Sequence, residues 1–287
     1  MAKTQAPINE EASSTYTQKV RKFYDSYGWK TERDGDRYLN DIRYGAPKAS
    51  PKDEKSSQAG WQGRYWSYFD EGGRFFLDAG CGAKPIIQTG CKFQRHVCVD
   101  ISLLGLTEAR QKLGEHGLYV VADLCALPFK DQVFDGVVAS YCLYLIQKDA
   151  QVSALKEFYR VIQMNKNILV FSFAKNSLIS MTHRLGKGLV KILRAPLVVS
   201  RWLLGRNRAR SAALPPPQFQ SPFQLSKGFR SVDITCLRTL TRVETNILRK
   251  LRLLEPAMRF CFFLERKFPH AMLLIGAHAA IRIQKTD

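Results

Sequence analysis

The sequence predicts an α/β fold built on a mainly parallel sheet. Three short apolar runs each end in an aspartate, at Asp78, Asp100 and Asp123, and these residues are 22 and 23 positions apart. Each interval has room for a helix or turn that returns the chain to the same edge of the sheet, as in βαβ units. Two further apolar runs, residues 134–140 and 167–173, extend the pattern to five strands.

The first apolar run leads directly into a glycine loop. Residues 78–82 read Asp-Ala-Gly-Cys-Gly and follow the apolar residues 75–77. Glycine lacks the Cβ atom that keeps a backbone away from a ligand, so this loop favours a nucleotide-type site. Because the third glycine of the dinucleotide fingerprint is missing, we expect a ligand with an adenosine and a charged amino-acid tail but no phosphates. An ordinary βα turn is the alternative interpretation of the loop alone.

The strand-end aspartates are expected to converge on one ligand. The carboxyl ends of parallel strands line one crevice, where ligands of open α/β sheets bind. Asp100 is placed to accept hydrogen bonds from ribose hydroxyls, and Asp123 to bind the amino group of adenine. The sequence therefore indicates an adenosine-containing ligand at this edge of the sheet.

Five segments in this order resemble the motifs of the class I S-adenosylmethionine-dependent methyltransferases, in particular the small-molecule branch (methyltransferase type 11) that includes the ubiquinone/menaquinone C-methyltransferases. The segments are residues 77–82, 99–102, 122–129, 134–138 and 157–162. The resemblance implies a Rossmann-like seven-stranded sheet, parallel with an antiparallel last strand and with helices on both faces. It also implies S-adenosyl-L-methionine as the cofactor and methyl transfer by in-line displacement.

The resemblance also implies which residues contact the cofactor. These are Asp78, Ala79, Gly80, Gly82, Asp100, Ile101, Asp123, Leu124 and Ser140. The two glycines would lie under the methionine part, and Asp78 would hold the loop and the ammonium group. Many relatives carry a histidine just past the fourth strand, but residues 140–145 contain none, so we do not expect a histidine base.

Aromatic residues are the candidates for the acceptor side of the site. Tyr141 and Tyr144 follow the fourth strand and would orient or deprotonate an acceptor, or form the wall of an apolar pocket. A helix capped by Ser14 or Thr15 is expected to run to about residue 27. The aromatic residues at its end would pack together or cover the substrate as a lid, and these are Tyr24, Tyr27 and Trp29.

The net charge of +19 is concentrated outside the core motifs, because residues 176–260 hold 16 Lys/Arg and only 3 Asp/Glu. Within this stretch, four basic residues share an arc of about 80° on a helix, and they are Arg184, Lys187, Lys191 and Arg194. This predicts a basic amphipathic helix inserted after the fifth strand. It would contact an anionic membrane surface or pack as a lid with a solvated basic face.

Composition and spacing limit the remaining possibilities. The polar start and the lack of an apolar run of about 18 residues favour a cytoplasmic protein, peripheral at the membrane through its basic insertion. Seven cysteines without a CxxC pair indicate reduced thiols. No cluster of His, Asp or Glu has metal-ligand spacing in the sequence, so we expect no metal.

The predicted organisation has four parts. Residues 1–60 form a disordered start and an aromatic lid helix, and residues 61–175 form the cofactor-binding core. Residues 176–227 form the basic amphipathic insertion, and residues 228–287 supply two strands, a turn at Gly228 and a lid helix over about 243–267. The sequence does not indicate an oligomeric state.

Three hypotheses for the function remain open at this point. The first is a methyltransferase for a small apolar, lipid-linked or glycosylated acceptor. The second is an RNA methyltransferase whose basic insertion clamps phosphates, although no Asn/Asp-Pro-Pro-Tyr motif follows the fourth strand. The third is a non-catalytic scaffold, which the intact glycine loop and three strand-end aspartates disfavour.

Overall fold

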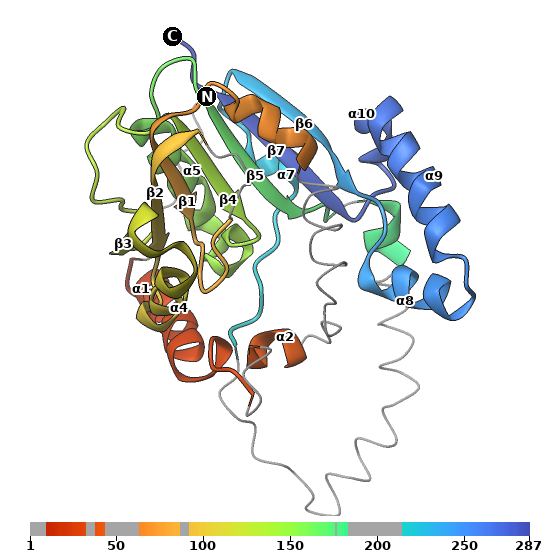
Figure 1. Ribbon diagram of the computed structural model, residues 1–287, viewed down its shortest axis with the longest axis horizontal. Helices are drawn as coiled ribbons and strands as arrows, with labels where there is room; N and C mark the ends of the chain where they lie inside the picture. The colour runs from red at the N-terminus through yellow and green to blue at the C-terminus, as the bar shows by residue number, and fades with distance from the viewer. Residues whose placement is uncertain (1–9, 33–37, 44–62, 87–91, 176, 183–213) are drawn as a thin grey trace, which may run out of the picture. The chain divides into compact units, whose positions relative to one another are not determined.

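The computed structural model describes residues 10–32, 38–43, 63–86, 92–175, 177–182 and 214–287 (Figure 1). The predicted basic insertion falls mainly on residues 183–213, so its four clustered basic residues lie outside the described part of the chain. These are Arg184, Lys187, Lys191 and Arg194. Among the described residues, no helix is both long enough and apolar enough for a membrane crossing.

In the described part of the chain, seven strands form one sheet in the order β3-β2-β1-β4-β5-β7-β6. The strands are β1 Gly73–Ala79, β2 Phe93–Asp100, β3 Gly117–Val121, β4 Gly136–Ser140, β5 Asn167–Phe173, β6 Ser231–Arg238 and β7 His278–Gln284. Strands β1 to β5 pair in parallel. Lys285 N donates to Lys166 O, and Ala174 N donates to Ala277 O at the other end of β5, so β7 runs antiparallel. The predicted Rossmann-like sheet is confirmed.

The central strands are apolar along nearly their whole length, as expected for parallel strands covered on both faces. The fully buried residues of β4 and β5 are Val137, Val138, Ala139, Ile168, Leu169, Val170 and Phe171. At the edge of the sheet, β3 leaves Leu118 and Val121 exposed. Burial therefore decreases from the centre of the sheet toward this edge.

The helices are α1 Glu10–Phe23, α2 Leu39–Arg43, α4 Leu103–Leu113, α5 Gln151–Val161, α7 Pro222–Leu225, α8 Arg242–Lys250, α9 Leu254–Lys267 and α10 Pro269–Met272. Helix α1 begins at Glu10 rather than at Ser14 or Thr15, so the helix starts earlier than the sequence predicted. A π-helical turn, Tyr24–Gly28, continues α1. A 3₁₀ helix, Gly63–Phe69, precedes β1.

The single helix expected over residues 243–267 is instead two helices, α8 and α9. Helix α8 starts with a capping box in which Thr241 accepts from Val243 N and Glu244 reaches back to Thr241 N. It ends because Arg252 adopts φ +58°, the left-handed conformation that terminates helices. The residues between the two helices thus form a tight turn.

The chain divides into two compact units. Unit 1 comprises residues 1–172, 214–233 and 280–287, and unit 2 comprises residues 173–213 and 234–279. Unit 1 contains the glycine loop and the strand-end aspartates. Unit 2 contains α8, α9 and α10, with a small core made of Ala174, Cys236, Met272, Leu273 and Ala279. The four-part organisation predicted from the sequence remains a prediction.

Arg160 on α5 is hydrogen-bonded to the turn that follows β3. Its guanidinium donates to the carbonyl oxygens of Leu127 at 3.0 Å and Phe129 at 2.7 Å. It also pairs with Glu157 and Asp131, each at 2.7 Å. Because Glu157 in turn accepts from Leu127 N at 2.8 Å, two of the sequence motifs, residues 122–129 and 157–162, are one hydrogen-bonded unit.

We predict that Arg160→Lys lowers the free energy of unfolding by about 2 kcal/mol, because an ammonium group lacks the planar fork that reaches two carbonyls and two carboxylates. Urea denaturation measures this difference. The matched control is Lys156→Arg on the exposed side of the same helix, which should change little. Equal stability of the Arg160→Lys protein and the unchanged protein would contradict the role of Arg160 in stabilising this turn.

Candidate functional site

The glycine loop turns sharply at the end of β1. Gly80 has φ +71° and Gly82 has φ +53°, conformations that favour glycine. Gly80 N donates to Val99 O at 2.7 Å and so folds the loop back onto β2. The sequence pattern of the loop therefore has a direct backbone cause.

Asp100 at the end of β2 connects the loop to the start of α4. Its Oδ2 accepts from Gly82 N and its Oδ1 accepts from Ser102 N, both at 2.8 Å. Burial raises the pKa of Asp100 to about 6, although the backbone hydrogen bonds from Ser102 and Gly82 oppose this. The residue as a whole is partly exposed at the end of the strand, next to the glycine loop.

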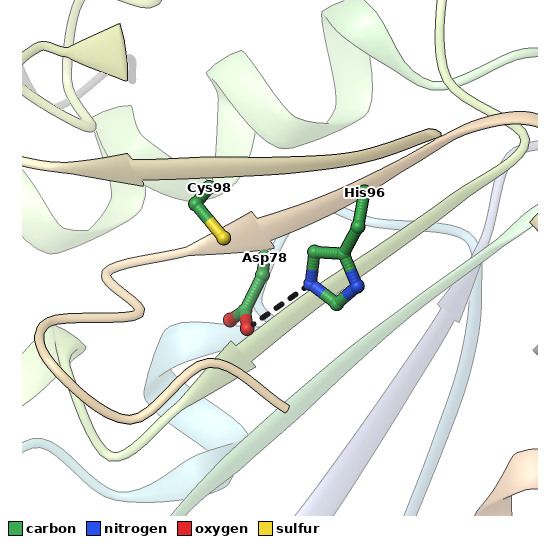
Figure 2. Close-up of side chains that lie close together, drawn as sticks. All are labelled: Asp78, His96 and Cys98. Atoms are coloured by element: carbon green, nitrogen blue, oxygen red, sulfur yellow. Dashed lines mark hydrogen bonds and ion pairs between the residues drawn. The ribbon is translucent and has the colours of Figure 1, made fainter. Parts of the chain in front are cut away.

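Asp78 lies beneath the loop rather than on its surface. Only 1% of the residue is exposed, and its Oδ2 accepts from Ile86 N at 2.7 Å. The same oxygen is 3.4 Å from His96 Nε2 on the neighbouring strand β2 (Figure 2). These contacts support the predicted role of Asp78 in holding the loop, and its contact with an ammonium group remains a prediction.

The buried cluster in Figure 2 was not anticipated from the sequence. Residues 78 and 98 are neighbours in the register of β1 and β2, so Asp78 comes together with His96 and Cys98, which lie two residues apart on β2. Burial alone would lower the pKa of His96, but its hydrogen bonds with Asp78 and Cys98 raise it to about 10. The imidazole therefore lies in a polar environment within the buried sheet, with its Nε2 facing Asp78 Oδ2.

The ligand atoms of these three residues lie within 4.8 Å of one another, which makes them the group in the described ranges that could hold a metal ion. Each of them already takes part in hydrogen bonds, including the one from Ile86 N to Asp78. The cluster is thus accounted for as a support beneath the glycine loop, and we assign no metal to it.

The ends of β3 and β4 hold the other predicted cofactor residues. Asp123 Oδ1 accepts from Cys125 N at 2.9 Å, and the carboxylate is partly exposed. Tyr141 is the first residue after β4 and has φ +54°. Its backbone N–H donates to Phe171 O at 2.9 Å. The predicted cofactor residues with partly exposed surface are Gly80, Asp100, Ile101, Asp123 and Ser140, and the buried ones are Asp78, Ala79, Gly82 and Leu124.

Cys142 is a site residue that the sequence analysis missed. A Cβ atom on Gly80 would lie 2.5 Å from the Cβ of Cys142, so this side chain fills the space that the glycine leaves. The Cys142 thiol also donates to Ala79 O at 3.2 Å. The feature of the sequence that could have indicated Cys142 is a small residue just after the fourth strand.

Asp25 is the second residue that was missed. Its Oδ1 accepts from Ser102 Oγ at 2.7 Å and from Leu104 N at 3.2 Å. A carboxylate is stabilised at the first turn of a helix such as α4, where backbone N–H groups are unpaired. The N-terminal segment is thereby hydrogen-bonded to the turn next to Asp100.

Of the predicted aromatic lid residues, Trp29 packs onto the glycine loop. Trp29 stacks on Tyr24 with ring centroids 5.0 Å apart, and Tyr27 packs in the same cluster. A Cβ atom on Gly82 would lie 2.2 Å from the Trp29 ring. The ring of Tyr144 is 5.3 Å from that of Phe219.

Trp29 also provides a test of whether a cofactor fits. Its Nε1 is buried and has no hydrogen-bond partner in the described part of the chain. A buried donor without an acceptor is costly, and an acceptor group on a ligand would satisfy it. The partly exposed Asp100 and Asp123 add two carboxylate acceptors at neighbouring strand ends. This set of donors and acceptors fits an adenosine that carries a carboxylate-bearing tail.

Comparison with known families agrees with this geometry. Residues 77–170 match a family model described as a methyltransferase domain. The matched segment begins at the last residues of β1 and ends within β5, so it contains the glycine loop and the strand-end aspartates. Residues 77–170, about a third of the chain, are therefore similar to a methyltransferase domain.

Two curated relatives are ubiquinone/menaquinone biosynthesis C-methyltransferases, from Vibrio parahaemolyticus and Vibrio campbellii. Each is 34% identical over 116 residues, which is 36% of this chain and 42% of the relative. The chain thus matches less than half the length of these proteins. A solved S-adenosylmethionine-dependent methyltransferase from Archaeoglobus fulgidus is 20% identical and covers 86% of this chain and 98% of its own, with a TM-score of 0.48.

We predict that Gly82→Ala disturbs the aromatic cover of the loop, because the new methyl group would collide with Trp29. Gly114→Ala is the matched control, since Gly114 has nearly the same φ, +54°, but open space around it. Both changes should cost about 1 kcal/mol of backbone strain. Only Gly82→Ala should also shift the tryptophan fluorescence spectrum, and equal spectra for the two variants would contradict the packing.

Proposed function

We propose that the protein is an S-adenosylmethionine-dependent methyltransferase acting on a small apolar acceptor. The observation that carries this proposal is the position of Asp100, whose carboxylate accepts from Gly82 N of the glycine loop and which is a partly exposed residue at the end of β2. It lies within the segment that matches the methyltransferase domain. A non-catalytic scaffold would have no use for a partly exposed aspartate beside such a loop.

The proposed roles of the residues follow from their places in the site. The cofactor, when bound, supplies a methyl group on a positively charged sulfur. Asp100 accepts hydrogen bonds from the ribose hydroxyls, and Asp123 accepts one from the adenine amino group. Trp29 donates its unpaired N–H to the tail of the cofactor. Asp78 and Asp25 position the loop and the start of α4 through their hydrogen bonds.

Tyr141 and Tyr144 are the proposed residues next to the acceptor. A tyrosine with φ +54° is uncommon, and strained residues of this kind cluster at functional sites. Both tyrosines are partly exposed. Their hydroxyl groups would orient the acceptor, and the protein's main contribution to catalysis would be alignment of the acceptor with the methyl group.

The acceptor class is proposed from the relatives and from the charge distribution. The matched Vibrio proteins are named as C-methyltransferases of ubiquinone/menaquinone biosynthesis. These names support a carbon atom of an apolar, lipid-linked molecule as the methyl acceptor. We also propose a cytoplasmic protein that meets an anionic membrane surface through the segment containing Arg184, Lys187, Lys191 and Arg194. The excess of basic residues in residues 176–260 supports this partner.

We predict that Asp100→Ala abolishes binding of S-adenosylhomocysteine in calorimetric titration, because both the ribose acceptor and the bond to Gly82 N are lost. Asp149→Ala, a change of an exposed aspartate just before α5, is the matched control and should bind normally. A circular dichroism melt checks that both variants are folded. Unchanged affinity in a folded Asp100→Ala protein would overturn the cofactor site.

Binding of S-adenosylhomocysteine should weaken below neutral pH. Desolvation by the surrounding protein raises the pKa of Asp100 to about 6, and only the ionised carboxylate accepts bonds from both ribose hydroxyls. Affinity should be nearly constant above pH 7 and fall about ten-fold by pH 5, as one pH unit below the pKa leaves about a tenth of the group ionised. Titration of Asp100→Asn at the same pH values should lack this dependence. An identical pH profile for both proteins would contradict the role of Asp100.

A further inference from the structure

The net charge of the chain is carried mainly by unit 2. Residues 173–213 and 234–279 hold 17 basic and three acidic residues, a net charge of +14 out of the chain's +19. One of the three acids, Glu265, is buried and accepts from Thr239 N. Eight of the 17 basic residues lie in residues 183–213, outside the described part of the chain, and the described residues of the unit still hold nine basic and three acidic residues, an excess that attracts anions.

Unit 2 also exposes most of the large apolar side chains. Of the 15 that are exposed among the described residues, 11 belong to this unit, although it is the smaller of the two. Six of them lie on α8, on α9 and in the turn between these helices. We name them the α8–α9 surface: Val243, Ile247, Leu251, Leu253, Phe260 and Phe263.

The turn between the helices concentrates both features in a few residues. Leu251 is 61% exposed and Leu253 is 51% exposed, on either side of Arg252. The left-handed conformation of Arg252 makes the turn tight. Leu251 and Leu253 therefore belong to the same short turn. Arg249 and Lys250 at the end of α8 are exposed as well. The turn between α8 and α9 therefore carries exposed apolar side chains flanked by exposed basic ones.

The two helices continue this pattern away from the turn. Val243 and Ile247 are four residues apart on α8, and Phe260 and Phe263 are three apart on α9, so each pair shares a helix face. Lys267 lies one turn beyond Phe263, with its Nζ 5.7 Å from the ring centroid. Each helix thus presents exposed apolar residues close to basic ones.

We propose that the α8–α9 surface binds to an anionic lipid bilayer, with Leu251 and Leu253 entering the interface and Arg249, Lys250 and Arg252 contacting lipid head groups. Amphipathic helices that carry basic residues beside large apolar ones bind membrane interfaces in this way. Each cation near an anionic bilayer adds to the attraction. The surface lies in described residues and is distinct from the basic segment at residues 184–194.

Other occupants of this surface fit the observations less well. A second copy of the chain would bring a unit of +14 against another of +14, and like charges oppose such a contact. RNA would be attracted by the basic residues, but of the six apolar side chains only Phe260 and Phe263 on α9 offer bases an aromatic ring, and the turn itself exposes leucines that cannot stack. A bilayer with anionic lipids satisfies the apolar and the basic side chains together.

The test is flotation of the purified full chain with vesicles of phosphatidylcholine alone or of phosphatidylcholine mixed with phosphatidylglycerol. We expect binding to the mixed vesicles only, and weaker binding as salt is raised. Leu251→Ser combined with Leu253→Ser should weaken this binding at least about ten-fold, since two apolar anchors are lost. Arg249→Glu with Lys250→Glu should weaken it by more than ten-fold, since each removed cation costs roughly five-fold.

The matched control changes two exposed apolar residues of unit 1, Leu118→Ser with Phe223→Ser, which should leave vesicle binding intact. Vesicle binding requires neither cofactor nor catalysis, so titration with S-adenosylhomocysteine reports separately on the proposed function. Circular dichroism confirms that each variant is folded.

Several outcomes would overturn the proposal. One is failure of the unchanged protein to bind the mixed vesicles. A second is full binding by the Leu251/Leu253 variant together with loss of binding when Arg184, Lys187, Lys191 and Arg194 are changed to Ser, which would assign the membrane contact to that segment. A third is a dimer, or a complex with total RNA, that the Leu251/Leu253 variant abolishes while vesicle binding persists.

Discussion

The hydrogen bonds of Asp100 are the interaction on which the site depends. One carboxylate oxygen binds the glycine loop through Gly82 N, and the other binds the turn into α4 through Ser102 N. A single side chain thereby sets two loops that come from different strand ends. Because burial keeps its pKa near 6, the carboxylate that a ligand would need is also the one that shapes the loop.

Around this aspartate, the site is built from segments far apart in the chain. Asp25 binds Ser102 and Leu104 N, so the N-terminal segment is tied to the same turn that Asp100 holds. Trp29 then covers Gly82, and its N–H is left without a partner in the described residues. An aromatic cover with an unpaired donor is suited to a ligand that has both an apolar ring and a polar tail. Trp29 and the glycine loop therefore pack together as one part of the site.

Charge and chemistry are divided between the two units. Unit 1 contains the glycine loop and the strand-end acids, whereas unit 2 carries most of the basic residues and most of the exposed apolar ones. An enzyme that acts on a lipid-linked acceptor has to meet its substrate where the lipid resides. The proposed membrane surface of unit 2 and the proposed acceptor chemistry of unit 1 thus agree physically, although each rests on its own observations.

The sequence alone determined the sheet, the glycine loop and the three strand-end aspartates, because strand periodicity and positive-φ glycines are local properties. Tertiary structure decided what those residues touch. The register of β1 and β2 places Asp78 beside His96 and Cys98, and no local pattern encodes such a pairing. The role of Asp25 likewise depends on where the N-terminal segment packs. The break at Arg252 was also hidden, since its flanking residues all favour a helix and only the backbone conformation reveals the turn.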